Sequence, residues 1–351
     1  MSVGQDAGFA VVDRDTRPPV RIGVLGAGRI GRMHAQLLHQ EIAGAVVTAV
    51  ADIVPGVADR VASTLGVRAM SIADVMAAPD VDAVAICSST DTHVDLVIDA
   101  AKAGKAVFCE KPISLDLLAV DRALAAVDAA AVPFMVGFNR RFDPSHASVG
   151  AAVRQGALGE LHTLRITSRD PAPPPPEYVA VSGGIFLDMT IHDFDMARFI
   201  TGSEVVQVYA QGSVRIDARI GEAGDVDTAV TVLTHADGTI TTIENSRQAV
   251  FGFDQRVEAF GAAGMAVSDN PPRHTGWVRT AAATSSQPLA WFFLDRYLSS
   301  YRAEWDAFIA YLRDGGTSPV DALAARAPVV IGLAATRSMR ERRPVAIAEI
   351  E

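Results

Sequence analysis

The chain has 351 residues, of which 49% are hydrophobic and 21% charged, a composition typical of globular proteins rather than of disordered ones. This length exceeds what one hydrophobic core usually serves, so we expect two domains. The formal net charge of −10 argues against a nucleic-acid partner, because a protein that binds a phosphate backbone needs a basic surface.

Residues 1–19 are polar and acidic, and their only apolar run, residues 9–12, is too short for the core of a signal peptide. No stretch approaches the roughly 18 consecutive apolar residues that span a membrane. The two cysteines, Cys87 and Cys109, lie in apolar stretches that suit buried free thiols, as in a reducing cytosol. We therefore predict a cytoplasmic protein that does not enter a membrane, with residues 1–19 as an N-terminal extension.

An apolar strand at 21–25 leads directly into a glycine pattern and then into a helical segment. This order is typical of dinucleotide-binding domains. Gly26 permits the tight turn, Gly28 leaves room for a pyrophosphate, and Gly31 lets the helix and the strand pack closely. The helix N-terminus offers its N–H groups to the phosphates. The cofactor-binding residues expected here are Gly26, Gly28, Arg29, Ile30 and Gly31.

A helical stretch at 33–40 is followed by a second apolar run, residues 45–51, which ends in Asp52. An acidic residue about 20 positions after the glycines suits the ribose 2′-hydroxyl of NAD. Asp52 would repel the 2′-phosphate of NADP, and Ile53 and Val54 provide no arginine to hold that phosphate. We therefore predict NAD as the cofactor.

Short apolar strands alternate with helical stretches up to about residue 138. This alternation predicts a doubly wound α/β domain, in which a parallel sheet is covered by helices and the ligand lies beyond the carboxyl ends of the strands. Further strands are expected at 83–87, 106–109 and 134–138, and helices at 57–65, 93–103 and 115–130. We assign residues 20–138 to a dinucleotide-binding Rossmann domain.

After residue 138 the pattern changes to strands joined by short turns, which predicts an α+β domain with a largely antiparallel sheet over residues 139–351. We expect one strand at 161–168, hairpins over 228–244 (around Asp237-Gly238) and 256–267, and two amphipathic helices at 297–313 and 322–343, the latter stopped by Pro344. The proline-rich segment 171–176 is either a spacer or the rim of a pocket.

Two groups of residues could carry chemistry beside the cofactor. The first is Glu110-Lys111-Pro112 at the predicted end of a strand, where ligands of parallel sheets bind. Lys111 could direct its ammonium group at a substrate hydroxyl. It could equally be an ordinary surface lysine.

The second group lies around His192. If a helix begins near Asp188, then Asp188 and His192 are four positions apart and share one face. His192 could then accept a hydroxyl proton, with Asp188 or Asp195 holding its ring. Alternatively, Asp188 caps the helix and His192 is a satisfied core residue. A zinc site is a third interpretation, but no further His or Cys has suitable spacing, so we expect no metal.

Together, the glycine pattern, Glu110-Lys111-Pro112 and Asp188-x-x-x-His192-Asp193 resemble the glucose–fructose oxidoreductase/inositol dehydrogenase (Gfo/Idh/MocA) family, and the match runs from residue 20 onward. The resemblance is strongest to the family's bacterial inositol 2-dehydrogenases. It rests on the stretches 135–143, 168–171, 177–179, 182–198, 245–249 and 254–258. The loop 87–93 is similar to the family's cofactor-contacting loop. This implies that Ser88, Thr90 and His93 contact NAD, and we place Glu110 with them.

The resemblance also implies roles for the chemical residues. Lys111 would bind the reacting hydroxyl and assist proton transfer, His192 would be the general base, and Asp188 would orient the substrate and the histidine. It further implies an open-faced second sheet that pairs between subunits to give a homotetramer. The implied reaction is NAD-dependent oxidation of a ring secondary hydroxyl of a cyclic polyol to a ketone, with myo-inositol as the first candidate substrate.

A polyol pocket has to satisfy several substrate hydroxyls. Candidates are Arg141, Asp170 and Tyr178, although Arg141 could form a structural ion pair and Tyr178 could pack beneath the proline-rich segment. Two other functions stay open: oxidation of another inositol isomer or sugar, and NAD-dependent regulation without turnover. The presence of Lys111 and His192 argues against a regulator, because a sensor needs no base at the site of hydride transfer.

Overall fold

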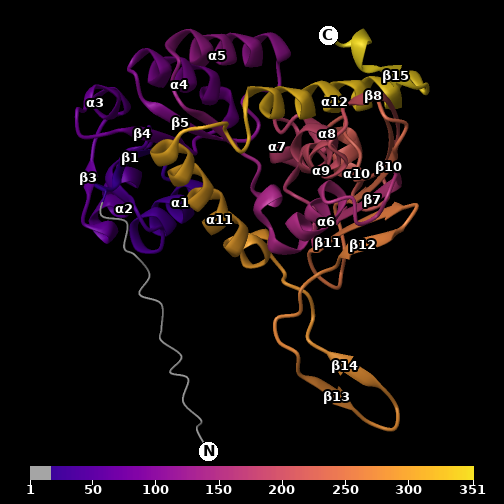
Figure 1. Cartoon of the computed structure of the whole chain (residues 1–351). Coiled ribbons are helices and arrows are strands. Elements are labelled where there is room, and N and C mark those ends of the chain that lie inside the picture. The colour runs from indigo at the N-terminus through magenta and orange to yellow at the C-terminus, as the bar shows by residue number, and fades with distance from the viewer. Residues whose placement is uncertain (1–16) are drawn as a thin grey trace, which may run out of the picture.

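The computed structural model describes residues 17–351, and the predicted extension over residues 1–19 lies almost wholly outside that range. Two sheets stand side by side, and two long C-terminal helices run between and over them (Figure 1). Within the described range, no helix is both long enough and apolar enough to cross a membrane.

The first sheet is parallel, and its six strands follow the order β3-β2-β1-β4-β5-β6. Its strands are β1 (Val20–Leu25), β2 (Ala45–Ala51), β3 (Arg68–Ala69), β4 (Ala83–Ile86), β5 (Ala106–Glu110) and β6 (Phe134–Gly137). Its helices are α1 (Arg29–Gln40), α2 (Val57–Leu65), α3 (Ile72–Ala77), α4 (Thr90–Lys102) and α5 (Leu117–Ala130). The order reverses between β1 and β4, which places the ligand crevice beyond the ends of these two strands. The predicted Rossmann-type sheet is confirmed.

Burial and length explain which helices and strands could be predicted from the sequence. Strand β4 is buried on both faces and therefore forms a continuous apolar run. Helices α1 and α4 begin several residues earlier than predicted, because their first turns are polar and do not show the apolar periodicity. The short elements β3 and α3 went unpredicted, since two and six residues are too few for a periodic pattern.

The second sheet has seven strands in the order β12-β11-β7-β10-β9-β8-β15. Its strands are β7 (Leu161–Arg169), β8 (Val205–Ser213), β9 (Thr228–His235), β10 (Ile240–Ser246), β11 (Asp254–Gly261), β12 (Gly264–Ser268) and β15 (Val345–Ala346). Only β7 and β10 pair in parallel, and all other neighbours in this sheet are antiparallel. The largely antiparallel sheet and both predicted hairpins are confirmed.

One face of the second sheet is covered and the other is open. The helices α6 (Pro144–Arg154), α9 (Ile191–Thr201) and α12 (Ala322–Glu341) pack on the covered face, over a core that includes Leu164 and Ile243. On the open face Val230, Ile240 and Phe260 are exposed. The remaining short helices are η1 (Asn139–Phe142), α7 (Pro176–Val179), α8 (Gly184–Asp188), α10 (Ala218–Glu222) and η2 (Ile347–Glu349).

The end of the chain returns to the first sheet. Helix α11 (Phe293–Asp314) packs Trp305 and Phe308 into the core of that sheet, and α12 adds Ala325 and Val329 to the same core. Residues 139–351, proposed as the second domain, thus contribute to both cores.

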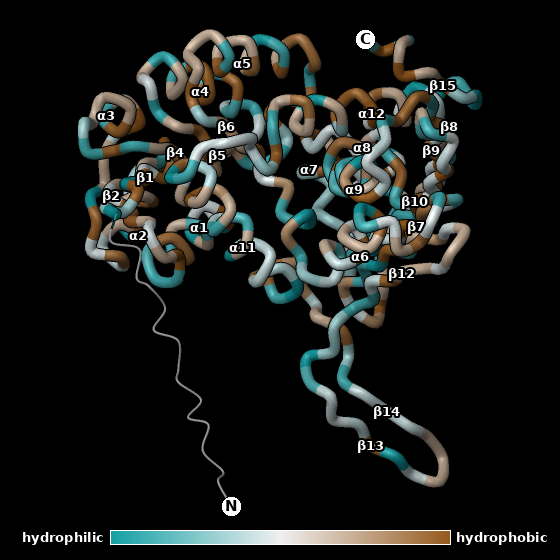
Figure 2. Tube along the Cα trace, viewed as in Figure 1, coloured by the Kyte–Doolittle hydropathy of each residue, from teal (hydrophilic) through white to brown (hydrophobic). Residues whose placement is uncertain are grey.

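One segment stands away from both sheets. The strands β13 (Trp277–Arg279) and β14 (Thr284–Ser286) form a hairpin that projects from the body (Figure 1). Figure 2 shows the strongly apolar segments concentrated in the body, while most of this hairpin is polar or intermediate. The hairpin was not predicted.

Candidate active site

The glycine turn leads from β1 into α1 beside the end of β4. Gly26 has a φ of +91°, and a Cβ there would lie 2.5 Å from the backbone nitrogen of Ser88. A Cβ at Gly31 would lie 1.8 Å from the carbonyl oxygen of Gly26. At Gly28, in contrast, a Cβ would meet nothing within 4 Å. Packing within the chain therefore requires glycine at positions 26 and 31. Gly28 instead leaves open space at the N-terminus of α1.

Asp52 lies beside this turn. Its carboxylate accepts hydrogen bonds from the backbone N–H groups of Ala27 at 2.7 Å and Val54 at 2.8 Å. Gly28 has no side chain with which to cap α1, so the N–H groups of the first turn are available to an anion. Open space, free N–H groups and an adjacent carboxylate fit the pyrophosphate and ribose of NAD, which supplies the hydride acceptor when bound.

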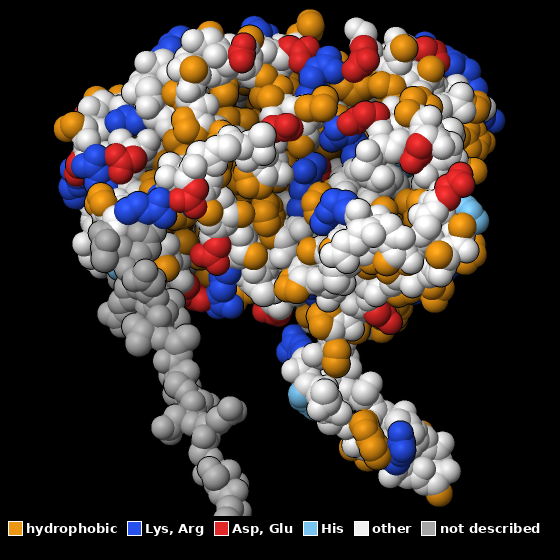
Figure 3. Space-filling model, viewed as in Figure 1, with side chains coloured by type: hydrophobic (Ala, Val, Ile, Leu, Met, Phe, Trp, Pro, Cys, Tyr) orange, Lys and Arg blue, Asp and Glu red, His pale blue; other side chains and the backbone are white. Residues whose placement is uncertain are grey.

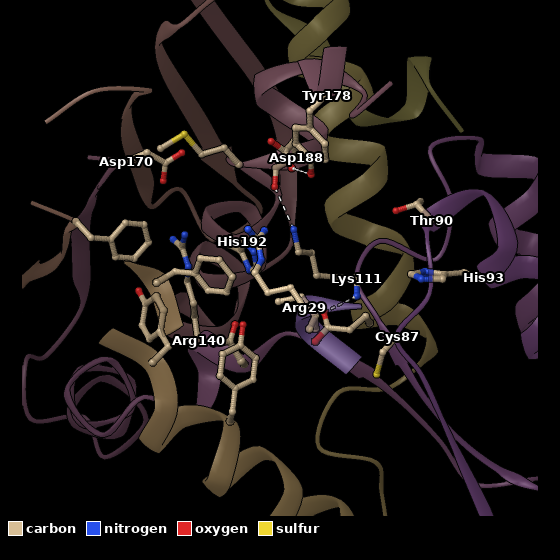
Figure 4. Close-up of a pocket in the computed structure, with 18 of the residues that line it drawn as sticks. Arg29, Cys87, Thr90, His93, Lys111, Arg140, Asp170, Tyr178, Asp188 and His192 are labelled. Carbon is tan, nitrogen blue, oxygen red and sulfur yellow. Dashed lines mark hydrogen bonds between the residues drawn. The ribbon is translucent and has the colours of Figure 1, made fainter. Parts of the chain in front are cut away.

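A cavity of about 320 Å³ opens where the carboxyl ends of β4 and β5 face the second sheet (Figure 4). The predicted residues that line it are Arg29, Ile30, Ser88, Thr90, His93, Glu110, Lys111, Asp170, Tyr178, Asp188 and His192. The three glycines and Asp52 do not line this cavity, and neither does Arg141. The structure thus brings the proposed catalytic residues together with the cofactor-side loops.

Lys111 directly follows β5 and points into the cavity (Figure 4). Its ammonium group donates to the backbone carbonyl oxygen of Asp188 at 3.2 Å, and its backbone N–H donates to Glu110 at 3.3 Å. Lys111 therefore joins the end of the first sheet to the segment that carries Asp188. This contact holds a cationic donor over the cavity.

The predicted helix through Asp188 and His192 is wrong in its boundaries. Helix α8 ends at Asp188 and α9 begins only at Ile191. The Thr190 hydroxyl lies 3.1 Å from the carbonyl oxygen of Ile185 and 2.9 Å from the side chain of Asn245, and these contacts compete with regular helix bonding. Asp188 and His192 therefore do not share one helical face.

The Asp188 carboxylate has other partners than the imidazole. It accepts hydrogen bonds from the Tyr178 hydroxyl and from the Arg247 guanidinium, both at 2.8 Å. Burial, followed by the Asp188 carboxylate, raises the pKa of Tyr178, so its hydroxyl remains a donor. Asp195, the alternative partner of the imidazole, forms an ion pair with Arg141 at 2.5 Å.

His192 lies beside Lys111 in the centre of the cavity (Figure 4). Burial, then the positive charges of Lys111 and Arg140, lowers its pKa well below 6.5. Its Nδ1 is buried and has no hydrogen-bond partner within residues 17–351. In the same range, no group of three or more His, Cys, Asp or Glu side chains is placed to hold a metal ion. At neutral pH the imidazole is neutral and can accept a proton.

Of the two arginines in η1, the one that lines the cavity is Arg140. Its guanidinium donates to Asp193 at 2.7 Å and to the Ser168 hydroxyl at 2.8 Å. Arg141 points elsewhere and donates to both carboxylate oxygens of Asp195, the structural ion pair considered as its alternative role. Adjacent residues in a tight helical turn face different directions, so the sequence alone does not distinguish them.

Arg247 had no predicted role. Its side chain is only 3% exposed, and it lies 2.8 Å from Asp188 and 3.9 Å from both Asp170 and Asp225. Its Nε and Nη2 are buried without a hydrogen-bond partner among the described residues. Burial raises the pKa of Asp170 to about 6, although Arg247 opposes this shift. One guanidinium thus lies near three carboxyl groups, of which Asp170 and Asp188 line the cavity.

Two histidines fix the loops on the cofactor side. The ring nitrogens of His93 lie 2.8 Å from the carbonyl oxygen of Pro112 and 3.1 Å from that of Ser88, so His93 ties two loops together. His34 accepts a hydrogen bond from the Trp305 indole at 2.8 Å, so its other nitrogen donates to Glu110 at 2.7 Å. The remaining lining residues that were not predicted are Cys87, Asn139, Met189, Phe253, Phe293, Tyr297 and Tyr301.

Comparison with known proteins agrees with this geometry. Residues 20–138 match the model of the oxidoreductase family with an NAD-binding Rossmann fold, and residues 146–267 match that of the GFO/IDH/MocA C-terminal domain. The myo-inositol 2-dehydrogenase of Thermotoga maritima is 46% identical over 333 residues, which cover 94% of this chain and 99% of that protein. The inositol 2-dehydrogenase of Rhizobium meliloti is 44% identical over 329 residues, with the same two coverages. The crystal structure of scyllo-inositol dehydrogenase from Lactobacillus casei with bound NAD(H) and scyllo-inositol superposes with a TM-score of 0.88 at 30% identity, covering 94% of this chain and 99% of that one.

Proposed function

Because this chain belongs to the GFO/IDH/MocA family of NAD-binding oxidoreductases, we propose that it oxidises a ring secondary hydroxyl of myo-inositol to the ketone, 2-keto-myo-inositol, with NAD. The observation that carries the proposal is the meeting of Lys111, Asp188 and His192 in one cavity beside the glycine turn. Inositol dehydrogenases at 44–46% identity over nearly their full length support the choice of substrate.

Lys111, His192 and Asp188 have different roles in binding the substrate and removing its hydroxyl proton. The ammonium group of Lys111 donates to the reacting hydroxyl and stabilises the negative charge that grows on its oxygen. His192, neutral through burial, accepts the hydroxyl proton. Asp188 binds a neighbouring hydroxyl while Tyr178 and Arg247 fix its carboxylate.

The wall around Arg247 suits a polyol. Arg247 and the carboxyl of Asp170 both line the cavity and offer donors and an acceptor to several hydroxyls at once. A site with buried polar groups rejects analogues that leave those groups unpaired. A second candidate substrate is scyllo-inositol, because one of the similar solved structures contains it as a bound ligand.

We further propose a cytoplasmic homotetramer assembled through the open face of the second sheet. That face exposes Val230, Ile240, Phe260, Met265 and Val267, which are apolar side chains that a partner sheet would cover. Cys87 and Cys109 are buried free thiols, a state that suits a reducing compartment.

Replacement of Lys111 tests the catalytic proposal. Lys111→Ala should lower kcat by orders of magnitude and leave the Kd for NAD almost unchanged, because the glycine turn and Asp52 hold the cofactor. The matched control is Lys102→Ala, since Lys102 is exposed at the end of α4. Near-normal turnover of Lys111→Ala would remove this residue from the mechanism.

A further inference from the structure

The segment between β12 and α11 leaves the body of the protein as an arm, defined here as residues 271–292 (Figure 1). At its end Trp277 pairs with Ser286, and Arg279 with Thr284, in an antiparallel hairpin. Every residue from 271 to 288 is exposed. A two-stranded hairpin of this size is at best marginally stable alone in water, so a partner surface would stabilise the arm.

The tip of the arm carries a tryptophan stacked with an arginine. The Arg279 guanidinium lies 3.8 Å from the centre of the Trp277 ring. Trp277 is 54% exposed and its neighbour Val278 is 62% exposed. Figure 3 shows hydrophobic and basic side chains next to each other at this tip. Tryptophan and arginine are enriched among the residues that dominate protein–protein binding, so the tip has the composition of a binding hot spot.

The arm is basic, whereas the protein as a whole is acidic. Arg273 and Arg279 give the arm a charge of +2 with no acidic residue, which leaves −12 on the rest of a chain whose total is −10. Arg273 pairs with Asp295 at the base of the arm, at 3.5 Å. Arg279 forms no ion pair with any described residue, and its guanidinium lies over the Trp277 ring. Its electrostatic complement is an acidic partner, and a second copy of this chain carries a formal net charge of −10.

The arm also continues the open face of the second sheet. It leaves that sheet from the edge strand β12, where Met265 and Val267 are 60% and 48% exposed and Met265 pairs with the exposed Phe260. A second copy seated on the open face would therefore lie within reach of the arm. We propose that the arm clasps a second copy of this chain, with Trp277 and Arg279 packed on an acidic surface of that copy. This inference rests on the homotetramer proposed above.

The base of the arm is fixed, so the hairpin can be removed by itself. The Phe253 N–H donates to the Ala290 carbonyl oxygen at 2.8 Å, and the rings of Phe292 and Phe293 lie 5.3 and 5.7 Å from the Arg29 guanidinium. Because Trp277 and Ser286 already pair, replacing residues 277–286 by two glycines closes the stalk without moving its ends.

Sedimentation velocity over a dilution series tests the proposal on the full-length chain. The wild type should be a tetramer, and the hairpin deletion should dissociate to smaller species at concentrations at least tenfold higher. The double variant Trp277→Ser/Arg279→Glu changes only exposed side chains and should shift dissociation in the same direction. The control Arg122→Glu reverses an exposed arginine on α5 and should leave dissociation unchanged.

The outcomes separate this inference from the proposed tetramer. A deletion variant that keeps the wild-type mass and dissociation constant overturns the role of the arm and leaves the homotetramer standing. A wild type that is monomeric at every concentration overturns both, while turnover on inositol would still support the catalytic proposal. Circular dichroism of each variant verifies that the chain is folded.

Discussion

Gly28 and Gly31 stand three positions apart in one turn, yet the structure predicts opposite effects for an alanine at each. A Cβ at Gly28 would meet nothing within 4 Å, and the backbone there, with φ −67° and ψ −163°, is open to alanine. A Cβ at Gly31 would lie 1.8 Å from the oxygen and 2.8 Å from the carbon of the Gly26 carbonyl group. Gly28→Ala therefore tests the ligand, and Gly31→Ala tests the fold.

Gly28→Ala should leave stability nearly unchanged and weaken NAD binding. The loss of chain entropy in the unfolded state stabilises by about 0.4–1 kcal/mol. Alanine is a poorer N-cap than glycine, which offsets part of this gain. The added methyl group occupies the space at the start of α1 where the pyrophosphate would accept N–H bonds. Losing one charge-assisted hydrogen bond costs about 1.5–3 kcal/mol, or roughly 10- to 100-fold in Kd.

Gly31→Ala should destabilise the first domain. The new methyl group forces α1 away from the turn, and overpacking of this kind costs about 1–3 kcal/mol or more. For domains of roughly 60–250 residues each kcal/mol lowers Tm by roughly 2–8 °C. The drop in Tm should therefore be measurable even without NAD.

Titration calorimetry with NAD and thermal unfolding of the two variants and the wild type measure both effects. A wild-type Kd for Gly28→Ala would mean that the pyrophosphate does not pass over Gly28, and the cofactor assignment would fail. If Gly28→Ala instead lost as much Tm as Gly31→Ala, the space in front of α1 would not be open.

Three further variants test individual side chains. Asp52→Ala should weaken the preference for NAD over NADP, measured as the ratio of kcat/KM values, and an unchanged ratio would contradict the ribose contact. Burial raises the pKa of Asp170 in the folded protein to about 6, so folding favours its neutral form and the contribution of this group to stability falls as pH rises from about 4 to 6. Asp170→Asn should therefore unfold at higher urea than the wild type at pH 8 and at the same urea at pH 4, and equal midpoints at pH 8 would refute the raised pKa. Arg247→Met removes the cation shared by three carboxyl groups and should raise KM for the polyol at least tenfold with the Kd for NAD unchanged, whereas an unchanged KM would exclude Arg247 from the substrate wall.

Local patterns were enough to predict five of the six strands of the first sheet, all except β3. The positive φ of Gly26 and the close approach of Gly31 to the Gly26 carbonyl group both lie within the turn, so the glycine spacing predicts them. The buried strand β4 and the hairpin around Gly238 likewise depend on residues close in sequence. The same holds for Lys111, whose position follows from the end of β5.

The rest of the site depends on contacts between distant segments. Thr190, in the break between α8 and α9, bonds Asn245, which is far away in sequence. Helical spacing does not contain this break and therefore misplaced Asp188 relative to His192. Arg247 reaches the cavity only because β10 ends beside α8. The return of α11 to the first sheet places Trp305 behind His34, a contact between residues 271 positions apart.

The most direct test is NADH formation by the purified protein with NAD and myo-inositol, run beside scyllo-inositol, chiro-inositol, glucose and xylose, and repeated with NADP. We expect fast turnover on an inositol and much slower turnover with NADP. Activity on glucose or xylose alone would still support the catalytic mechanism but would refute inositol as the substrate. No turnover on any of these substrates while NAD still binds would contradict inositol dehydrogenase activity and favour a non-catalytic, NAD-binding regulator.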